Sequence, residues 1–185
     1  MVFNLTPPLS ICKTVACSWK ENVLYNFNGG SDGYGLGGLV WDQQANLYAS
    51  RPYGGSADYG VVDQFTKVGN SWTATPIHTF TGQPDGARPN KDLITDSSGN
   101  IFGTTSSGGL YGLGTVCELS YVGGQWVETI LYNFENNTDC DGECPAAGVT
   151  MDSAGNLYGT AATSSSPNCS GWSVFELARS GESYT

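Results

Sequence analysis

His78 is the only histidine of the chain, and histidine is the side chain best suited to general acid–base catalysis near neutral pH. Catalysis of that kind also requires a nucleophile and an orienting carboxylate within hydrogen-bond reach of the imidazole. The sequence places no such partners at a recognisable spacing from His78. We therefore expect His78 to be a packed strand residue, and no catalytic residue is predicted.

Two glycine-rich segments resemble catalytic or phosphate-binding loops in composition. Residues 29–33 match the G-x-S-x-G pattern of serine hydrolases, but that pattern requires a helix after the serine, and none is predicted here. The equivalent segment further along the chain has Pro84 in place of Ser31. Residues 108–114 lack the Lys-Ser pair of a phosphate loop. Both segments are predicted to be loops between strands.

Acidic side chains alternate over one short segment, at Asp139, Asp141 and Glu143. Carboxylate oxygens placed in this way suit Ca²⁺, although the spacing does not complete the pattern of a calcium-binding loop. Ca²⁺ is therefore the one cofactor that the sequence suggests. The 17 acidic residues do not single out the pair of carboxylates that a glycoside hydrolase needs.

The chain has six cysteines, and an even number in a glycine-rich, lysine-poor sequence favours disulfide bonds formed in an oxidising compartment. The spacing lies outside the usual zinc-binding patterns, while reduced thiols and a zinc site stay open as alternatives. The expected pairs are Cys12 with Cys17, Cys140 with Cys144, and Cys117 with Cys169.

Aromatic and acidic residues gather in loops that are predicted to meet at one end of the fold. Exposed aromatic rings beside Asp or Asn suit the faces of sugars or a protein partner. The alternative is that these rings pack on their own strands. The candidate ligand-binding residues are Tyr53, Asp58, Tyr59, Tyr111 and Trp172.

The elements that position these residues follow a repeat. Segments 42–48, 96–102 and 152–158 share the order Asp, three variable residues, Asn, Leu or Ile, and Tyr or Phe, at steps of 54 and 56 residues. Other landmarks keep the same register: Trp19, Trp72, Trp126 and Tyr184; Phe27, Phe80 and Phe134; Asp32, Asp85 and Asp141.

Within each unit, short apolar segments of period two are separated by Gly, Asp, Asn and Ser. This pattern predicts four antiparallel strands per unit and no long helix, with the Asp-x-x-Gly-Asn segment as a tight turn. Such units indicate an all-β, propeller-like array of three four-stranded blades, belonging to a longer ring or an open arc. A β-trefoil is the alternative fold.

The segment from Gly99 to Phe134 resembles the GloVer-type tandem repeat of bacterial exported proteins, and the opening and late segments of the chain fit the same pattern. The resemblance covers nearly the whole chain, implies export, and carries over no reaction and no catalytic residues. The chain departs from the pattern at Ala45, Asp63, Cys117 and Trp172.

We expect one repeat domain over residues 1–185, with a last strand and a cysteine-containing loop over 1–18 and repeats over 19–71, 72–125 and 126–183. Four last strands are present against three of each other kind. An open arc exposes strand edges, so self-association or pairing with neighbouring repeats is expected.

A net charge of -10 disfavours nucleic acid and anionic membrane surfaces as partners, and no apolar segment is long enough to span a bilayer. No signal peptide is recognisable in this sequence, so a secreted or cell-surface location would depend on a signal outside it. The leading hypothesis is an exported, non-enzymatic module that binds a glycan or a protein. The alternatives are a fragment of an extracellular propeller hydrolase or lyase, and a purely structural self-assembling array.

Overall fold

The structure is a computed structural model, and it describes residues 1–7, 19–29, 34–135, 143–166, 169–181 and 183–185, without the side chains of 143, 163–166 and 169–170. The described residues form strands and no helix, which confirms the predicted all-β class. None of them forms a helix that could cross a bilayer. The strands are β1 (Val2–Thr6), β2 (Lys20–Tyr25), β3 (Val40–Trp41), β4 (Leu47–Arg51), β5 (Val61–Val68), β6 (Ser71–Thr79), β7 (Gly86–Pro89), β8 (Ile94–Thr95), β9 (Ile101–Gly108), β10 (Thr115–Val122), β11 (Gln125–Asn133), β12 (Glu143–Pro145), β13 (Thr150–Met151), β14 (Leu157–Ser166), β15 (Cys169–Leu177), β16 (Arg179–Ser180) and β17 (Ser183–Tyr184).

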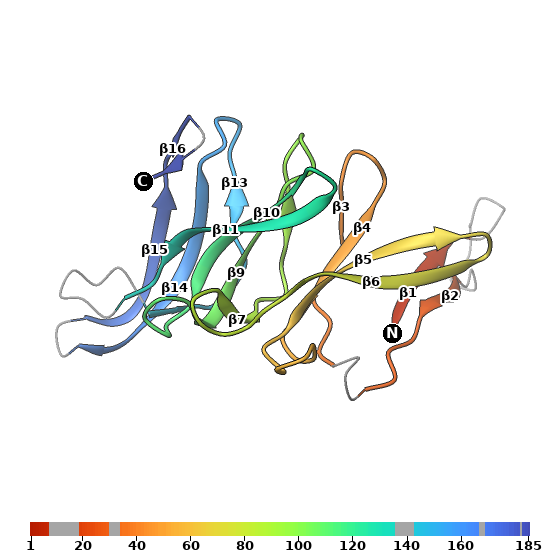
Figure 1. Cartoon of the computed structure of the whole chain (residues 1–185), viewed down its shortest axis with the longest axis horizontal. Helices are drawn as coiled ribbons and strands as arrows, with labels where there is room; N and C mark the ends of the chain where they lie inside the picture. Colours follow the sequence, from red (N-terminus) through yellow and green to blue (C-terminus); the bar gives the residue numbers. More distant parts are fainter. Residues whose placement is uncertain (8–18, 30–33, 136–142, 167–168, 182) are drawn as a thin grey trace, which may run out of the picture.

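The strands form small antiparallel sheets that follow one another along the long axis of the molecule (Figure 1). After the β1–β2 hairpin comes sheet 1, in the order β3-β4-β5-β6. Sheet 2 has the order β11-β10-β9-β7 with β8 beside β9, and sheet 3 has β12-β14-β13 with β15 beside β14. A short β16–β17 hairpin follows. Among the described strands no sheet closes into a barrel, as a β-trefoil requires.

Tight hairpins set which strands are neighbours. In the turn between β10 and β11, Gly123 and Gly124 have φ of 61° and 89°. Two consecutive positive φ values are typical of the two-residue hairpin turns that match the twist of the strands. The hairpin therefore joins the last strand of one sequence repeat to the first strand of the next, so that sheets 1 and 2 each combine strands of two repeats.

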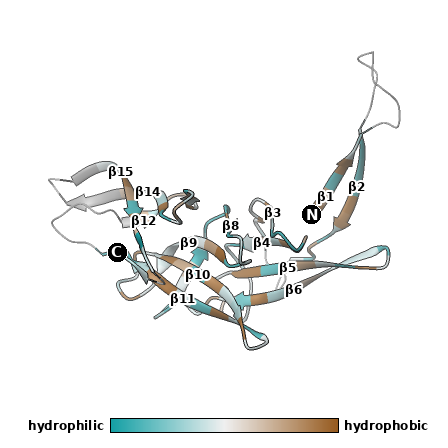
Figure 2. Ribbon diagram, turned by 90° about the horizontal axis from the view of Figure 1, so that it is seen from above, coloured by the Kyte–Doolittle hydropathy of each residue, from teal (hydrophilic) through white to brown (hydrophobic). Residues whose placement is uncertain are grey.

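Three buried apolar clusters lie between successive sheets. Val2, Leu47 and Phe65 bury the contact between the β1–β2 hairpin and sheet 1. A second cluster, which includes Tyr48, Phe80 and Leu119, lies between sheets 1 and 2. The third, which includes Phe102, Phe134 and Leu157, lies between sheets 2 and 3. Figure 2 shows hydrophobic segments along β5, β6, β10 and β11.

The landmarks of the sequence repeat have matching surroundings in these clusters. Phe80 and Phe134 are both almost completely buried, each in its own inter-sheet cluster. Trp72 packs against the first cluster, Trp126 against the second, and Tyr184 against the third. Each module therefore covers its apolar face with the next module, because no single four-stranded sheet can bury its own face.

Polar contacts also connect the modules. The Ser50 hydroxyl donates to the Asn90 carbonyl oxygen at 2.6 Å, and the Thr104 hydroxyl donates to the Ala147 carbonyl oxygen at 2.7 Å. Ser50 and Thr104 occupy the same repeat position, 54 residues apart. The register between modules is thus held by buried hydroxyl groups as well as by apolar packing.

Candidate functional site

The Asp42 turn, which connects β3 to β4, is built around one carboxylate. Asp42 Oδ1 accepts hydrogen bonds from the main-chain N–H groups of Gln44 and Asn46 at 2.9 and 2.7 Å. Its Oδ2 accepts from Asn46 Nδ2 at 2.7 Å and from the Tyr48 hydroxyl at 3.1 Å. Burial alone would raise the pKa of Asp42, but these hydrogen bonds outweigh it, and the pKa lies below its ordinary value.

The same turn recurs in the next two modules. Asp96 accepts from the N–H groups of Ser98 and Asn100 at 2.9 Å, and Asp152 accepts from those of Ala154 and Asn156 at 2.8 and 2.9 Å. The Asp-x-x-Gly-Asn motif is therefore turn chemistry, as predicted, and these aspartates hold main-chain amides. Thr95 of one turn donates to the Trp41 carbonyl oxygen of the previous one at 2.9 Å, which sets successive turns beside each other.

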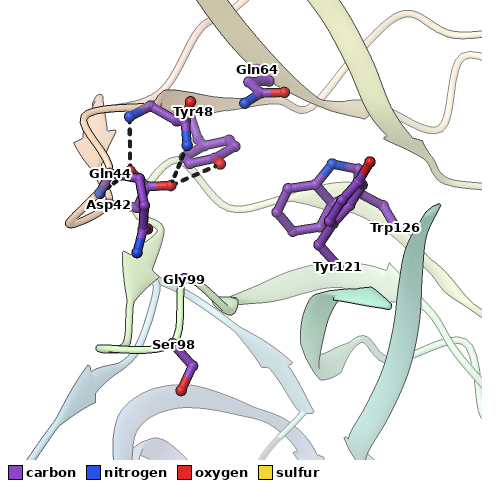
Figure 3. A pocket seen from close by; sticks show the side chains of 9 residues that line it. Asp42, Gln44, Tyr48, Gln64, Ser98, Gly99, Tyr121 and Trp126 are labelled. Atoms are coloured by element: carbon purple, nitrogen blue, oxygen red, sulfur yellow. Dashed lines mark hydrogen bonds between the residues drawn. The ribbon is translucent and has the colours of Figure 1, made fainter. Parts of the chain in front are cut away.

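A pocket of about 430 Å³ opens between the first two of these turns (Figure 3). We call it the first inter-sheet pocket, because sheet 1 and sheet 2 each supply part of its lining. Its volume is within the range of small-molecule sites. The lining residues are Asp42, Gln44, Asn46, Tyr48, Gln64, Ser98, Gly99, Tyr121 and Trp126.

Aromatic rings form one wall of the first inter-sheet pocket. Tyr121 and Trp126 are directly opposite each other in the β10–β11 hairpin, and their ring centroids lie 5.4 Å apart. Trp126 also meets the Tyr48 ring edge to face, with centroids 5.8 Å apart. Tyr121 is 62% exposed. The buried Tyr48 ring thus fixes the indole, while Tyr121 beside it faces solvent.

Neutral polar groups form the rest of the wall. Within the described part of the chain, the side-chain amides of Gln44 and Gln64 and the Trp126 indole N–H make no hydrogen bond to protein, and Gln44 and Trp126 lie on opposite sides of the pocket in Figure 3. Burial, with a contribution from Asp42, raises the pKa of Tyr48 well above its ordinary value, so this hydroxyl stays protonated. Asp42 has its oxygens occupied by the turn.

An equivalent cavity of about 390 Å³, which we call the second inter-sheet pocket, lies between sheet 2 and the β16–β17 hairpin. In repeat register, Glu118 replaces Gln64, Arg179 replaces Tyr121, and Tyr184 replaces Trp126. The fold therefore makes this pocket once per module contact, and only the side chains differ. The lining residues are Asp96, Asn100, Phe102, Glu118, Ser120, Val122, Arg179 and Tyr184.

Three of the five ligand-binding residues predicted from the sequence, Tyr53, Asp58 and Tyr59, follow the end of β4 that is opposite the Asp42 turn. Tyr53 stacks on Tyr34 with ring centroids 4.5 Å apart, and the Arg88 guanidinium lies 4.7 Å from the Tyr53 centroid. The Arg88 N–H donates to the Tyr59 carbonyl oxygen at 2.7 Å, so Tyr53 and Tyr59 gather around one arginine. Asp58 has φ of 58°, and its side chain accepts a hydrogen bond from the Gly54 N–H at 2.7 Å.

Tyr111 and Trp172 lie on other modules. They are 52% and 73% exposed, and Tyr59 is 41% exposed. The structure thus displays these rings at the surface, but the contacts bring together only Tyr53 and Tyr59 of the predicted set.

Most of the predicted calcium and disulfide residues fall where the structure gives no description. Asp139 and Asp141 lie outside the described residues, and Glu143 begins β12 opposite Ala162. Cys12, Cys17 and Cys140 also lie outside them, as does the side chain of Cys169. The pairs Cys12–Cys17 and Cys140–Cys144 therefore stay predictions.

Cys117 is described, and it carries a free thiol. The expected link from Cys117 to Cys169 is not formed in this structure. The reason is the position of Cys117 in the middle of β10, where it packs in the cluster between sheets 1 and 2 and its Sγ lies 3.7 Å from the Gly103 carbonyl oxygen. Burial, with help from the Glu128 and Asp85 charges, raises the pKa of this thiol well above its ordinary value.

The residues of the first inter-sheet pocket were not among the predicted ligand residues. Trp126, Tyr48 and Asn46 were recognised as repeat landmarks and assigned to packing and turn roles. A signal was present in the sequence, because Trp126 and Asn46 recur at fixed positions at the same end of every module. Gln44, Gln64 and Tyr121 vary between the repeats and carried no signal of their own.

Comparison with known proteins supports the repeat reading of the chain. No curated protein matches it. The family model described as the Gloeobacter/Verrucomicrobia repeat matches residues 2–185, which include all three Asp turns and both inter-sheet pockets. The chain therefore belongs to the Gloeobacter/Verrucomicrobia repeat family.

Proposed function

We propose that this chain is an exported, non-catalytic repeat module that binds neutral saccharides in the first inter-sheet pocket. The observation that carries the proposal is the meeting of an aromatic wall, Trp126 with Tyr121, and two unengaged amides, Gln44 and Gln64, in one cavity. Aromatic rings stack on the apolar faces of sugars, and amides bond their hydroxyl groups. A small concave pocket also suits a sugar unit better than a protein surface.

Charge supports neutral sugars over acidic ones. The chain has a net charge of -10, and the described lining of this pocket contains no Lys or Arg. An acidic sugar would therefore enter a repulsive field without a cation to offset it.

The hydrolase or lyase alternative gains no support at this pocket. Glycoside hydrolysis uses two carboxyl groups on either side of the scissile bond. Of the nine described residues that line the pocket, Asp42 alone has a carboxyl group, and four hydrogen bonds from its own turn occupy it.

The architecture belongs to the same proposal. The four strands of sheet 1 and the equivalent strands of sheet 2 act as blades of a propeller-like arc, with sheet 3 as a third blade. The pairing of successive blades would then build one saccharide pocket per contact. This arrangement is consistent with the repeated inter-sheet clusters.

Self-assembly is a second candidate, favoured by apolar residues at the two ends of the array. Phe3 and Leu5 of the β1–β2 hairpin are 45% and 53% exposed. Val174 of β15 is 79% exposed. Exposed apolar side chains on strands favour strand pairing between copies.

A glycan array, followed by titration of the best neutral oligosaccharide, tests saccharide binding. Trp126→Ala should weaken binding at least about tenfold, because stacking against the indole is lost. Trp19→Ala is the matched control, since Trp19 has the same repeat position but is exposed on the β1–β2 side. Retained circular dichroism shows that each variant is folded. Absence of glycan binding, equal losses in both variants, or turnover of the bound sugar would contradict the proposal.

A further inference from the structure

Three titratable side chains meet where sheet 1 contacts sheet 2, away from both inter-sheet pockets. His78 Nε2 lies 3.5 Å from Asp85 Oδ2 and 3.6 Å from Glu128 Oε1. The nearest ligand atoms of the three residues all lie within 4.8 Å of one another, and no other such group of three or more occurs in the part of the chain that the structure describes. We call this set the His78 cluster.

Different elements bring the three side chains together. His78 is near the end of β6 in sheet 1, and Glu128 is on β11 in sheet 2; these two strands lie side by side. Asp85 is in the loop before β7. Its Oδ1 accepts hydrogen bonds from the N–H groups of Thr81 and Gly82 at 2.9 and 3.1 Å, and its Oδ2 also accepts from the Thr81 N–H at 3.2 Å. These bonds hold the carboxylate with Oδ2 on the side of the imidazole. The cluster therefore exists only when the two sheets pack.

The polar atoms at the centre of the cluster are not satisfied by the protein. The side chain of Glu128 is only 10% exposed, and those of His78 and Asp85 are 18% and 16% exposed. His78 Nε2 and Glu128 Oε1 are buried atoms without a hydrogen-bond partner among the described residues. A buried polar atom without a partner destabilises the fold, and more so if it is charged. Something other than the described protein groups should fill this position.

Charge identifies what is missing. Two carboxyl groups face one imidazole, and no Lys or Arg of the described residues forms an ion pair with Asp85 or Glu128. The cluster lacks a cation.

We propose that the His78 cluster binds a divalent transition-metal cation, with His78, Asp85 and Glu128 as its ligands and Zn²⁺ as the representative ion. Imidazole nitrogen together with carboxylate oxygen suits Zn²⁺ and its neighbours, whereas Ca²⁺ and Mg²⁺ prefer oxygen alone. With Zn–ligand bonds of about 2.1 Å, the donor atoms of a tetrahedral site lie about 3.4 Å apart. The two donor separations that involve His78, 3.5 and 3.6 Å, match that geometry, and the two carboxylate oxygens lie within 4.8 Å of each other.

The metal would join two modules. Glu128 belongs to sheet 2 and His78 to sheet 1, so one ion bound by both holds the sheets together. The partial exposure of His78 and Asp85 leaves a path for the ion and a fourth position for water.

The single histidine gives a site-specific test. In the full chain, treated with a chelator and then freed of it, the imidazole nitrogens of His78 are followed by NMR as Zn²⁺ is added. The expected result is a stoichiometric shift of the Nε2 resonance at one equivalent. Glu128→Gln should weaken this binding at least about tenfold. Glu21→Gln is the matched control, because Glu21 has the same repeat position on β2 and is exposed.

The absorption spectrum of bound Co²⁺ distinguishes this site from a site formed by cysteines. Co²⁺ bound by nitrogen and oxygen lacks the thiolate charge-transfer bands that cysteine ligands produce, so spectra without these bands support the proposal. Three results would overturn it: zinc binding that leaves the His78 resonances unchanged, equal affinity in Glu128→Gln and the parent chain, or His78 resonances that respond to pH but not to metal. Asp85→Asn provides a second ligand variant if Glu128→Gln does not fold.

Discussion

Two regions of this protein bury charged side chains near equivalent repeat positions. The first holds the Arg51–Asp63 ion pair, and the second holds the His78 cluster, which has no cation. In repeat register, Asp63 corresponds to Cys117, Arg51 to Thr105, and Tyr25 to His78. At the first place, Arg51 Nε and Nη2 donate to the two oxygens of Asp63 at 2.5 and 3.0 Å. The Arg51 guanidinium also lies 5.2 Å from the Phe27 centroid.

The second place has no guanidinium. Thr105 takes the position of Arg51 and shares a hydrogen bond of 2.9 Å with the Thr115 hydroxyl, while the acidic groups near His78 face each other without a cation. The same backbone thus accepts a self-contained ion pair in one module contact and an incomplete charge cluster in the next. The comparison shows that the repeat determines where polar side chains are buried. The individual residues at those places then decide whether the protein itself supplies the opposite charge.

Breaking the Arg51–Asp63 ion pair should have the largest effect on stability. Arg51→Met leaves Asp63 buried without its partner, and we expect the free energy of unfolding to fall by about 3–5 kcal/mol. Urea denaturation measures this change. The double variant Arg51→Met/Asp63→Leu should recover most of the loss, because no unpaired charge is left. A small loss in the single variant would show that the pair contributes little.

Binding of zinc at the His78 cluster should have the next largest effect on stability. Zinc at a hundredfold excess over its Kd should stabilise the parent chain by about 2.7 kcal/mol, since it binds only the folded state at this site. Thermal unfolding with and without a chelator measures the shift. Glu128→Gln should show little stabilisation, and Glu21→Gln should behave as the parent does. Equal stabilisation of all three chains would place the metal elsewhere.

Replacing the guanidinium of Arg51 by an ammonium group distinguishes the effect of geometry from the effect of charge in the Arg51–Asp63 pair. Arg51→Lys keeps a positive charge but loses the bidentate contact with Asp63 and the stacking on Phe27, and we expect a loss of about 1.5 kcal/mol. The same urea experiment applies. A loss as large as that of Arg51→Met would mean that geometry, and not charge, dominates the pair.

The pH dependence of the metal-free chain should show the smallest effect. The pKa of Glu128 is raised from 4.5 to about 8 in the folded state, so the folded protein holds a proton that the unfolded chain has already lost. Stability from this proton is present at low pH and is lost as pH rises through about 8. Between pH 7 and 9 we expect a fall of about 1 kcal/mol. Glu128→Gln should lack this component of the pH profile, measured against Glu21→Gln.

The repeat and its strands could be predicted because they are local and periodic. The Asp42 turn shows this, since its four hydrogen bonds all come from residues within six positions of Asp42. Trp72, Trp126 and Tyr184 were aligned by register alone, and each packs against its own inter-sheet cluster.

The pocket and the His78 cluster could not be predicted in this way. His78 was interpreted as a packed strand residue, which describes its burial but not its neighbours. Its ring does pack against Phe80, with centroids 4.5 Å apart. Glu128 lies 50 residues further along the chain. The residue type at its repeat position is not constant, because Glu21 and Ala74 occupy the equivalent positions. Its meeting with His78 depends on how β6 and β11 pack, which no local pattern encodes.

The amino-acid sequence by itself determined the all-strand modules, their register and their turns, because hydrogen bonding within a turn and alternation along a strand act over a few residues. Only the tertiary structure decided which side chains face each other between modules. The indole of Trp126 reaches Tyr48, and Glu128 reaches His78, because burial of apolar surface brings the sheets together. The hydrophobic effect is not directional, so the polar contacts between modules are set by how the sheets pack.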